Sequence, residues 1–183
     1  MAGSVTRLAR IPTIDRVLDT HAASLGRDFT PYRNHVYRVA TFCAAHVSPD
    51  PIELEKIAIA AAFHDLGIWT DGTFDYLDPS VSLARQYLLH AGREAWTDEI
   101  ATMILQHHKL TMYRGDSGSL VEVFRRSDWT DVSMGVLRFG LPRAFVRDVN
   151  ATWPSAGFHR RLVQLELERL RTHPLRPLPM VKL

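Results

Sequence analysis

The segment Ile57–Gly67, with the sequence IAIAAAFHDLG, constrains the fold more than any other part of the chain. Seven consecutive apolar residues lead into His64 and Asp65, and a glycine at position 67 is expected to end the helix. A helix that is apolar on all sides is typical of the middle of a bundle. Burying an imidazole and a carboxylate at its end costs on the order of several kcal/mol unless both have partners. A metal ion can satisfy both groups, so we expect other helices to bring further ligands to this point.

Apolar spacing and capping signals predict an all-α fold, because no alternating segment of useful length suggests a strand. Thr30 is the expected N-cap of a helix over Pro31–Val47, and Asp50 with Glu53 forms the expected capping box of a helix over Ile52–Leu66. The aromatic-rich stretch 67–78 is expected to be an ordered loop. Further helices are predicted over 11–25, 78–91, 97–107, 119–132, 145–149 and 158–170, followed by a surface tail over 174–183.

The totals indicate one globular domain over residues 1–183, and its last part, about 142–183, is expected to be a short helical extension. A net charge of +2 gives no reason to expect nucleic acid or an anionic membrane as partner. No apolar run reaches the ~18–20 residues of a membrane span. The first twelve residues lack a signal-peptide pattern, so a cytoplasmic location is expected. The single cysteine, Cys43, restricts any metal site to nitrogen and oxygen ligands.

Four ligand-type residues fall on predicted helices whose faces are otherwise apolar: His35, His64, Asp65 and Asp128. Two imidazoles and two carboxylates suit one divalent cation such as zinc, manganese, iron, nickel or cobalt. Adjacent helical side chains point ~100° apart, so His64 and Asp65 can share an ion only near a helix end. Taken singly, each histidine is as well explained by a bond to a backbone carbonyl, and each aspartate by a cap or an ion pair.

In combination, these residues resemble the motifs of the HD-domain metal-dependent phosphohydrolase superfamily. The segment 34–39, Asn-His-Val-Tyr-Arg-Val, is similar to the first motif, and 63–67, Phe-His-Asp-Leu-Gly, to the motif that names the family. Ser127-Asp128 resembles the short last motif. The resemblance covers about 31–131 and implies an HD helical bundle, often a homodimer, with the four residues above as metal ligands.

The number of metals depends on further histidines. Some HD proteins carry two more histidines after the His-Asp pair and hold two metals, as in certain phosphodiesterases and di-iron oxygenases. In this chain His107 or His108 fills the second of these positions, but Ser80 stands near the first. We therefore expect one divalent ion, with His107 lining the pocket and binding an anionic group of the substrate.

The resemblance implies hydrolysis of a phosphate ester, of a nucleotide or a small phosphorylated metabolite, by metal-activated water. Asp65 is expected to be catalytic as a ligand, and Asp71 and Asp75, in the following loop, as general acid or base. Arg33 and Lys109 are the cations expected to bind the small-molecule substrate. Arg38, one turn after His35, is expected to pair with an acid behind the ligands.

Three other function classes remain open, and one of them is the class of di-iron HD oxygenases named above. The pattern Tyr32-x-Asn34-His35-x-x-Arg38-Val39 is also similar to the cyanamide hydratase branch of HD proteins, which implies a lyase that adds water to a nitrile-type carbon. Such an enzyme needs fewer cations, and the aromatic residues after the His-Asp pair suit a small dry pocket. A non-catalytic ligand-binding module would keep the fold without the chemistry, but the complete ligand set argues against it.

Overall fold

The computed structural model describes residues 10–115, 119–172, 174 and 180, and in these residues it has helices and no strand, which confirms the all-α prediction. None of the described helices combines the length and the hydropathy needed to cross a membrane. The helices are α1 (Pro12–Thr20), α2 (Ala22–Leu25), α3 (Phe29–Val47), α4 (Pro51–Phe63), α5 (Gly67–Thr70), α6 (Leu77–His90), α7 (Thr97–Gln106), α8 (Leu120–Val132), α9 (Arg143–Thr152) and α10 (Phe158–Thr172), with 3-10 turns at Gly26–Asp28 and Glu94–Trp96.

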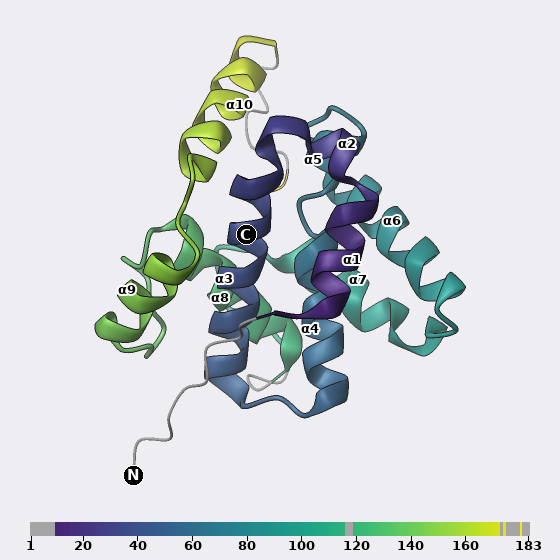
Figure 1. Cartoon of the computed structure of the whole chain (residues 1–183), viewed down its shortest axis with the longest axis vertical. Helices are drawn as coiled ribbons and strands as arrows, with labels where there is room; N and C mark the ends of the chain where they lie inside the picture. The colour runs from purple at the N-terminus through teal and green to yellow at the C-terminus, as the bar shows by residue number, and fades with distance from the viewer. Residues whose placement is uncertain (1–9, 116–118, 173, 175–179, 181–183) are drawn as a thin grey trace.

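Four helices form the centre of the bundle. Helix α3 packs against α4 and α8, and α7 packs against α4 and α8, so that the four surround one buried core. Helix α1 covers α4, α6 covers α7, and α10 lies along the outer side of α3 (Figure 1). Within this core, the C-terminal ends of α4 and α7 face α3 and α8.

Helix α4 has the central position that its composition predicts. The Asp50 side chain accepts hydrogen bonds from the backbone N–H groups of Ile52 and Glu53, while the Glu53 carboxylate accepts one from the Asp50 N–H, which confirms the capping box. From Ile57 to Phe63 every residue is buried. Because each large apolar side chain contributes about 1.5–3 kcal/mol on full burial, this helix is held firmly and can present polar groups at its end.

The predicted starts and ends of three other segments were wrong. Helix α3 begins at Phe29 rather than Pro31, because a 3-10 turn leads directly into it and places Thr30 inside the first turn. The helix expected over 11–25 is interrupted at His21 and divides into α1 and α2. Residue 67 does not end a helix: α4 ends at Phe63, and the expected loop opens with the short helix α5.

Gly67 is required at the start of α5 because the chain turns tightly against α6. A Cβ added at this position would lie 2.6 Å from the Tyr76 carbonyl oxygen and 3.0 Å from the Pro79 Cβ. Gly67→Ala should therefore lower the free energy of unfolding by about 1–3 kcal/mol, since backbone atoms have to move to relieve the overlap. Urea denaturation of both proteins measures this difference. Equal midpoints with equal slopes would show that the backbone at residue 67 accommodates a Cβ without loss of stability.

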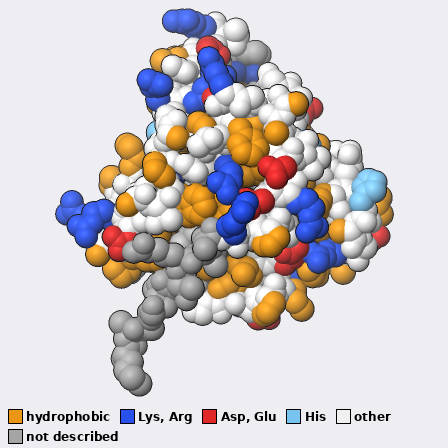
Figure 2. Space-filling view, viewed as in Figure 1, with side chains coloured by type: hydrophobic (Ala, Val, Ile, Leu, Met, Phe, Trp, Pro, Cys, Tyr) orange, Lys and Arg blue, Asp and Glu red, His pale blue; other side chains and the backbone are white. Residues whose placement is uncertain are grey.

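Helix α10 of the C-terminal extension is fastened to the bundle by polar contacts. Arg161 pairs with Asp28 at 2.9 Å, and Arg169 pairs with Asp75 at 2.8 Å. Lys and Arg side chains gather over this helix on the face shown at the top of Figure 2. Most of the expected surface tail, 174–183, lies outside the described residues; within it, Met180 is buried in a cluster with Ile68, Phe74 and Tyr76.

Candidate metal centre

His35 projects from the middle of α3 into the core and is fully buried. Its Nδ1–H donates to Asp131 Oδ2 at 2.6 Å, and its ring stacks on Phe158 of α10 with centroids 4.1 Å apart. Burial lowers the pKa of His35 to about 4 even though Asp131 opposes the shift. The imidazole is therefore neutral at pH 7, and its Nε2 presents a lone pair to the centre of the bundle.

His64 and His107 occupy equivalent places at the C-terminal ends of α4 and α7. Carbonyl groups in the last turn of a helix lack intrahelical partners. The His64 Nδ1–H donates to the Ala61 carbonyl at 2.8 Å, and the His107 Nδ1–H donates to the Ile104 carbonyl at 2.6 Å. Each contact fixes the ring so that Nε2 faces the same interior point, as is usual for a metal-binding histidine.

Two buried carboxylates, Asp65 and Asp128, face these nitrogens without full hydrogen bonding. Oδ1 of Asp65, both oxygens of Asp128 and Nε2 of His107 have no hydrogen-bond partner. Burial raises the pKa of Asp128 to about 7, and the carboxylates raise the pKa of His64 to about 9 although burial opposes that shift. Unpaired buried polar atoms are costly, and here they form a centre with excess negative charge, so the donor set fits a cation.

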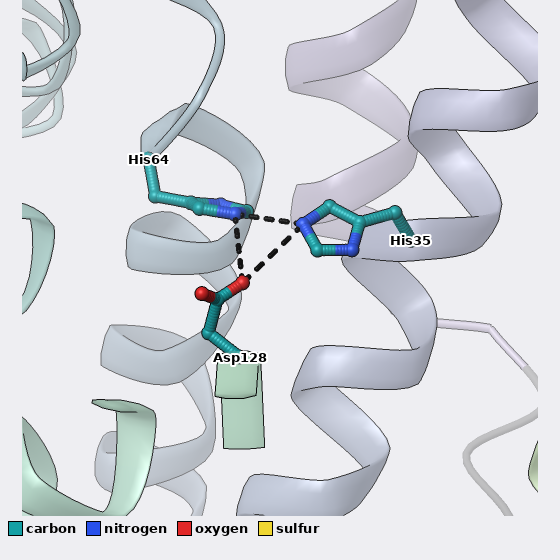
Figure 3. Close-up of side chains that lie close together, drawn as sticks. All are labelled: His35, His64 and Asp128. Atoms are coloured by element: carbon teal, nitrogen blue, oxygen red, sulfur yellow. Dashed lines mark hydrogen bonds and ion pairs between the residues drawn. The ribbon is translucent and has the colours of Figure 1, made fainter. Parts of the chain in front are cut away.

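The ligand atoms lie close enough to bind one ion. His35 Nε2 and His64 Nε2 are 2.9 Å apart, and Asp128 Oδ1 lies 3.6 and 3.7 Å from them, as Figure 3 shows. Asp65 Oδ2 lies 3.6 Å from His35 Nε2 and 3.3 Å from His64 Nε2. Four ligands at about 2.1 Å from a tetrahedral ion are about 3.4 Å from one another. The structure thus brings His35, His64 and Asp128 together in one potential metal-binding group, and it places Asp65 beside them in a second group with His64 and His107.

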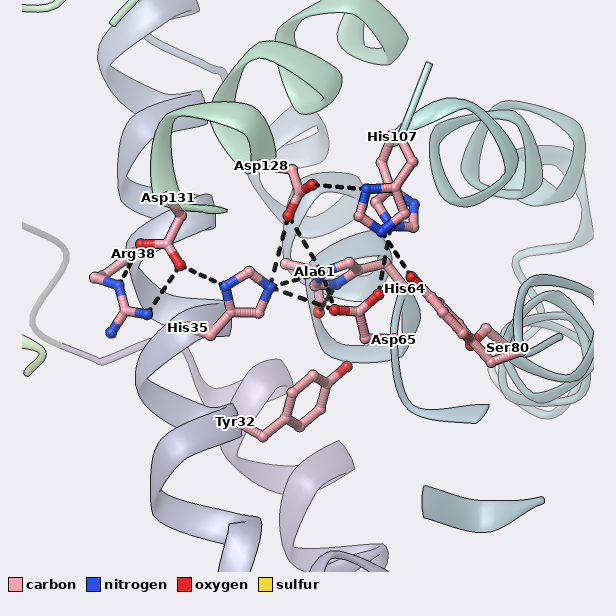
Figure 4. A network of polar contacts seen from close by, with 12 residues as sticks. Tyr32, His35, Arg38, Ala61, His64, Asp65, Ser80, His107, Asp128 and Asp131 are labelled. Carbon is pink, nitrogen blue, oxygen red and sulfur yellow. Dashed lines mark hydrogen bonds and ion pairs between the residues drawn. The ribbon is translucent and has the colours of Figure 1, made fainter. Parts of the chain in front are cut away.

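Asp131 supports the centre from behind His35. It accepts hydrogen bonds from Arg38 Nη2 at 2.8 Å and from Arg38 Nε, as well as the one from His35 (Figure 4). Although burial opposes it, the hydrogen bond from Arg38 holds the pKa of Asp131 well below its usual range. Arg38 has the ion pair expected for it, but Asp131 was missed, and its position three residues after Asp128 on the same helix face was the available signal.

Other described residues could provide metal ligands beside the group formed by His35, His64 and Asp128. Potential metal-binding groups are formed by His64, Asp65 and His107, and by His107, His108 and Asp128. His107 Nε2 lies 3.4 Å from Asp65 Oδ1, so this residue belongs to the ligand cluster rather than to a separate substrate contact. His108 Nδ1 lies 3.7 Å from Asp128 Oδ2, and its Nε2 is bonded to the Tyr76 hydroxyl at 2.7 Å.

A cavity of about 300 Å³ adjoins the cluster, which forms one end of it through Asp65 and His108. Aromatic and aliphatic side chains provide most of its wall. Helix α10 closes one side, so the C-terminal extension forms part of the candidate site. Its lining includes Phe74, Tyr76, Trp129, His159, Leu162, Val163 and Glu166.

Five residues predicted to act on or bind the substrate do not line this cavity, namely His107, which lies in the ligand cluster, and four residues outside it. Asp71 is exposed and accepts a hydrogen bond from Thr70, and the Asp75 side chain, 56% exposed, pairs with Arg169. The segment after α5 does reach the cavity, through Phe74 and Tyr76, but the side chains of Asp71 and Asp75 are exposed and are not among the lining residues. Arg33 pairs with Asp15 at 3.1 Å, and Lys109 follows His108 outside the lining residues.

The fold and the cluster together define an all-α protein with a buried His/Asp site that can hold a divalent metal. The family model of the HD domain matches residues 32–133, more than half of the chain. The chain therefore belongs to the HD-domain family, whose members form a superfamily of metal-dependent hydrolases. This match does not show the similarity to cyanamide hydratase. No curated protein and no solved structure matches the chain.

Proposed function

We propose that this protein is a metal-dependent hydrolase that holds one divalent cation with His35, His64, Asp65 and Asp128 and acts on a small molecule in the adjoining cavity. The observation that carries the proposal is the convergence of imidazole lone pairs with buried carboxylate oxygens that have no hydrogen-bond partner. When bound, such a cation lowers the pKa of its water ligand to about 7, in the case of zinc, and so supplies a hydroxide at neutral pH.

The residues of the chain have separate tasks in this proposal. Arg38 and Asp131 orient His35, and backbone carbonyls orient His64 and His107, so that the lone pairs are fixed before a substrate enters. His108 replaces Asp71 and Asp75 as the candidate for proton transfer. It lines the cavity, it is bonded to the Tyr76 hydroxyl, and burial holds its pKa well below the usual value, so the ring is neutral and keeps a lone pair.

A phosphate ester is the substrate class that the HD family implies. Transfer of a phosphoryl group requires positive charge around its oxygens. Among the described residues that line the cavity there is no lysine or arginine, and Arg38 is engaged by Asp131. Charge on a phosphate would therefore be compensated mainly by the one bound cation.

An uncharged substrate is the second candidate, and the apolar wall of the cavity favours it. Addition of water to a nitrile-type carbon develops less charge than phosphoryl transfer and requires a confined site more than it requires arginines. The aromatic residues Phe74, Tyr76 and Trp129 provide such a site beside the ligand cluster. Apolar pockets with a few fixed polar groups are the usual form of small-molecule sites.

Activity assays with the metal-loaded full chain separate the two candidates. We expect manganese- or cobalt-dependent release of phosphate from p-nitrophenyl phosphate or from nucleoside monophosphates if the first candidate is correct. Formation of urea from cyanamide would establish the second. A protein that binds stoichiometric metal but has neither activity, and none on a broader panel of esters and nitriles, would contradict the hydrolase proposal. It would then be a binding module.

The number of bound ions is a separate prediction. After loading with manganese and removal of free metal, we expect one equivalent per chain, because Asp128 is shared by two of the potential groups and a second ion would be less tightly held. Inductively coupled plasma mass spectrometry on dialysed protein measures the ratio. A ratio of two would mean that His107 and His108, which follow α7, complete a dinuclear centre.

A further inference from the structure

We propose that the cavity selects a small molecule with an apolar body and a cationic amine, and that Glu166 is the residue that determines this specificity. The inference rests on the proposed function in one respect, since it takes the cavity beside the metal ligands as the substrate site. It goes beyond that function by naming the charge of the part of the substrate that does not react.

The charges along the described cavity wall are of one sign. Asp65 and Glu166 contribute carboxylates, and no lysine or arginine lies among the described lining residues. Asp65 faces the histidines of the ligand cluster, so Glu166 is the carboxylate left for the substrate. Arg169, three residues further along α10, is engaged by Asp75 at 2.8 Å and is not part of the wall.

Glu166 is half-buried and makes no hydrogen bond or ion pair with any residue that the structure describes. A carboxylate beside an apolar wall is more stable when an opposite charge lies within a few ångströms. Since the described wall offers none, a positively charged group on the ligand is the chemistry that satisfies it. An anionic ligand would instead meet a like charge in an apolar setting.

The rest of the wall suits an organic cation. Phe74, Tyr76 and Trp129 line the same cavity, and aromatic ring faces attract ammonium groups. His159 adds no free group, because its Nε2 is bonded to the Asp131 backbone oxygen at 2.9 Å and its Nδ1 to the Ser155 hydroxyl at 2.9 Å. Leu162 and Val163, on the same helix as Glu166, complete a surface for an apolar body.

The test compares probes of similar shape and different charge on the metal-loaded full chain. The probes are 2-phenylethylamine, 2-phenylethanol, phenylacetate and benzyltrimethylammonium, the last of which cannot coordinate a metal. We expect calorimetric affinities for the two cations at least about 10-fold tighter than for the alcohol, with phenylacetate weakest. Equal affinities for phenylacetate and the cations would overturn the proposal.

Variants of α10 assign the effect to one side chain. Glu166→Gln keeps the shape and should remove the preference for cations over the alcohol, and Glu166→Lys should favour phenylacetate. Glu168→Gln, on an exposed position of the same helix, is the matched control and should bind as the wild type does. An unchanged preference in Glu166→Gln would exclude this residue. Because binding is measured, the outcome does not depend on whether the chain hydrolyses any tested substrate.

Discussion

Asp128→Asn should abolish tight metal binding and metal-dependent activity, and it should at the same time raise the melting temperature of the metal-free protein at pH 8. The carboxylate is buried, its two oxygens have no hydrogen-bond partner, and burial raises its pKa to about 7. A carboxyl group whose pKa is raised in the folded state destabilises that state at any pH where the unfolded chain is ionised. The amide removes this cost but supplies only a weak neutral ligand.

The pH dependence of this stabilisation provides a control for the prediction. The penalty is largest above pH 7 and decreases as pH falls toward 4, so the stabilisation in Asp128→Asn should shrink over the same range. In a chain of this size, each kcal/mol relieved corresponds to roughly 2–4 °C. Differential scanning fluorimetry with chelator or with manganese, from pH 5 to 8, measures both properties. A metal-free variant that melts below the wild type at pH 8 would mean that Asp128 has a structural role.

Asp65→Ala provides the companion test of the ligand set. It should also lose metal and activity together, because Asp65 Oδ2 lies within 3.6 Å of the facing nitrogens of both His35 and His64. Metal analysis after dialysis measures the loss. Retention of one metal equivalent by Asp65→Ala would remove this residue from the ligand set and weaken the proposed function.

Asp131→Asn should have the second large effect, on stability and on metal affinity together. It leaves the buried Arg38 guanidinium without its carboxylate, and breaking a buried ion pair on one side costs about 3–5 kcal/mol. It also weakens the support of His35, and loss of such a partner lowers metal affinity about 10–100-fold. Chemical denaturation and competition with a metal-binding dye measure the two effects.

A double variant separates these contributions. Arg38→Met with Asp131→Leu removes both charges, so much of the lost stability should return while the metal affinity stays low. The pKa of Asp131 lies below its usual range, so its contribution is complete above about pH 4 and is lost as pH falls further. The wild type should therefore lose stability under acid more steeply than the double variant. Wild-type metal affinity in Asp131→Asn would show that His35 is oriented by other means.

The four proposed ligands could be predicted from the sequence because each is recognisable locally. A polar residue on an apolar helix face is visible in the periodicity, and the His-Asp pair follows a helix start that Asp50 and Glu53 fix. The order of the motifs along the chain then predicts that these residues meet at one point, which their spacing alone does not predict. Helix α4 could be placed for the same reason, since its apolar residues leave it no position other than the core.

The rest of the site depends on contacts between distant segments. Asp131 pairs with Arg38 across 93 positions; an acid was expected for Arg38, but the spacing of Asp131 from Asp128 indicates only a shared helix face and does not identify it as that acid. The loop after the ligands does border the cavity, but it contributes Phe74 and Tyr76 to the wall, whereas Asp71 and Asp75 are exposed, and the sequence alone does not reveal which side chains of a loop face inward. Glu166 reaches the cavity only because α10 docks beside α3, and a charged amphipathic helix does not reveal its docking partner in its own sequence.

Phe158 stacks on His35, and α10 beyond it closes one side of the cavity, yet the family match stops at residue 133. A chain truncated at that point would keep every proposed ligand but would expose one face of an imidazole and lose one side of the cavity wall. Under the proposed function, the metal ligands therefore lie wholly within the part of the chain that the family model matches, whereas the substrate cavity is completed from outside it by α10.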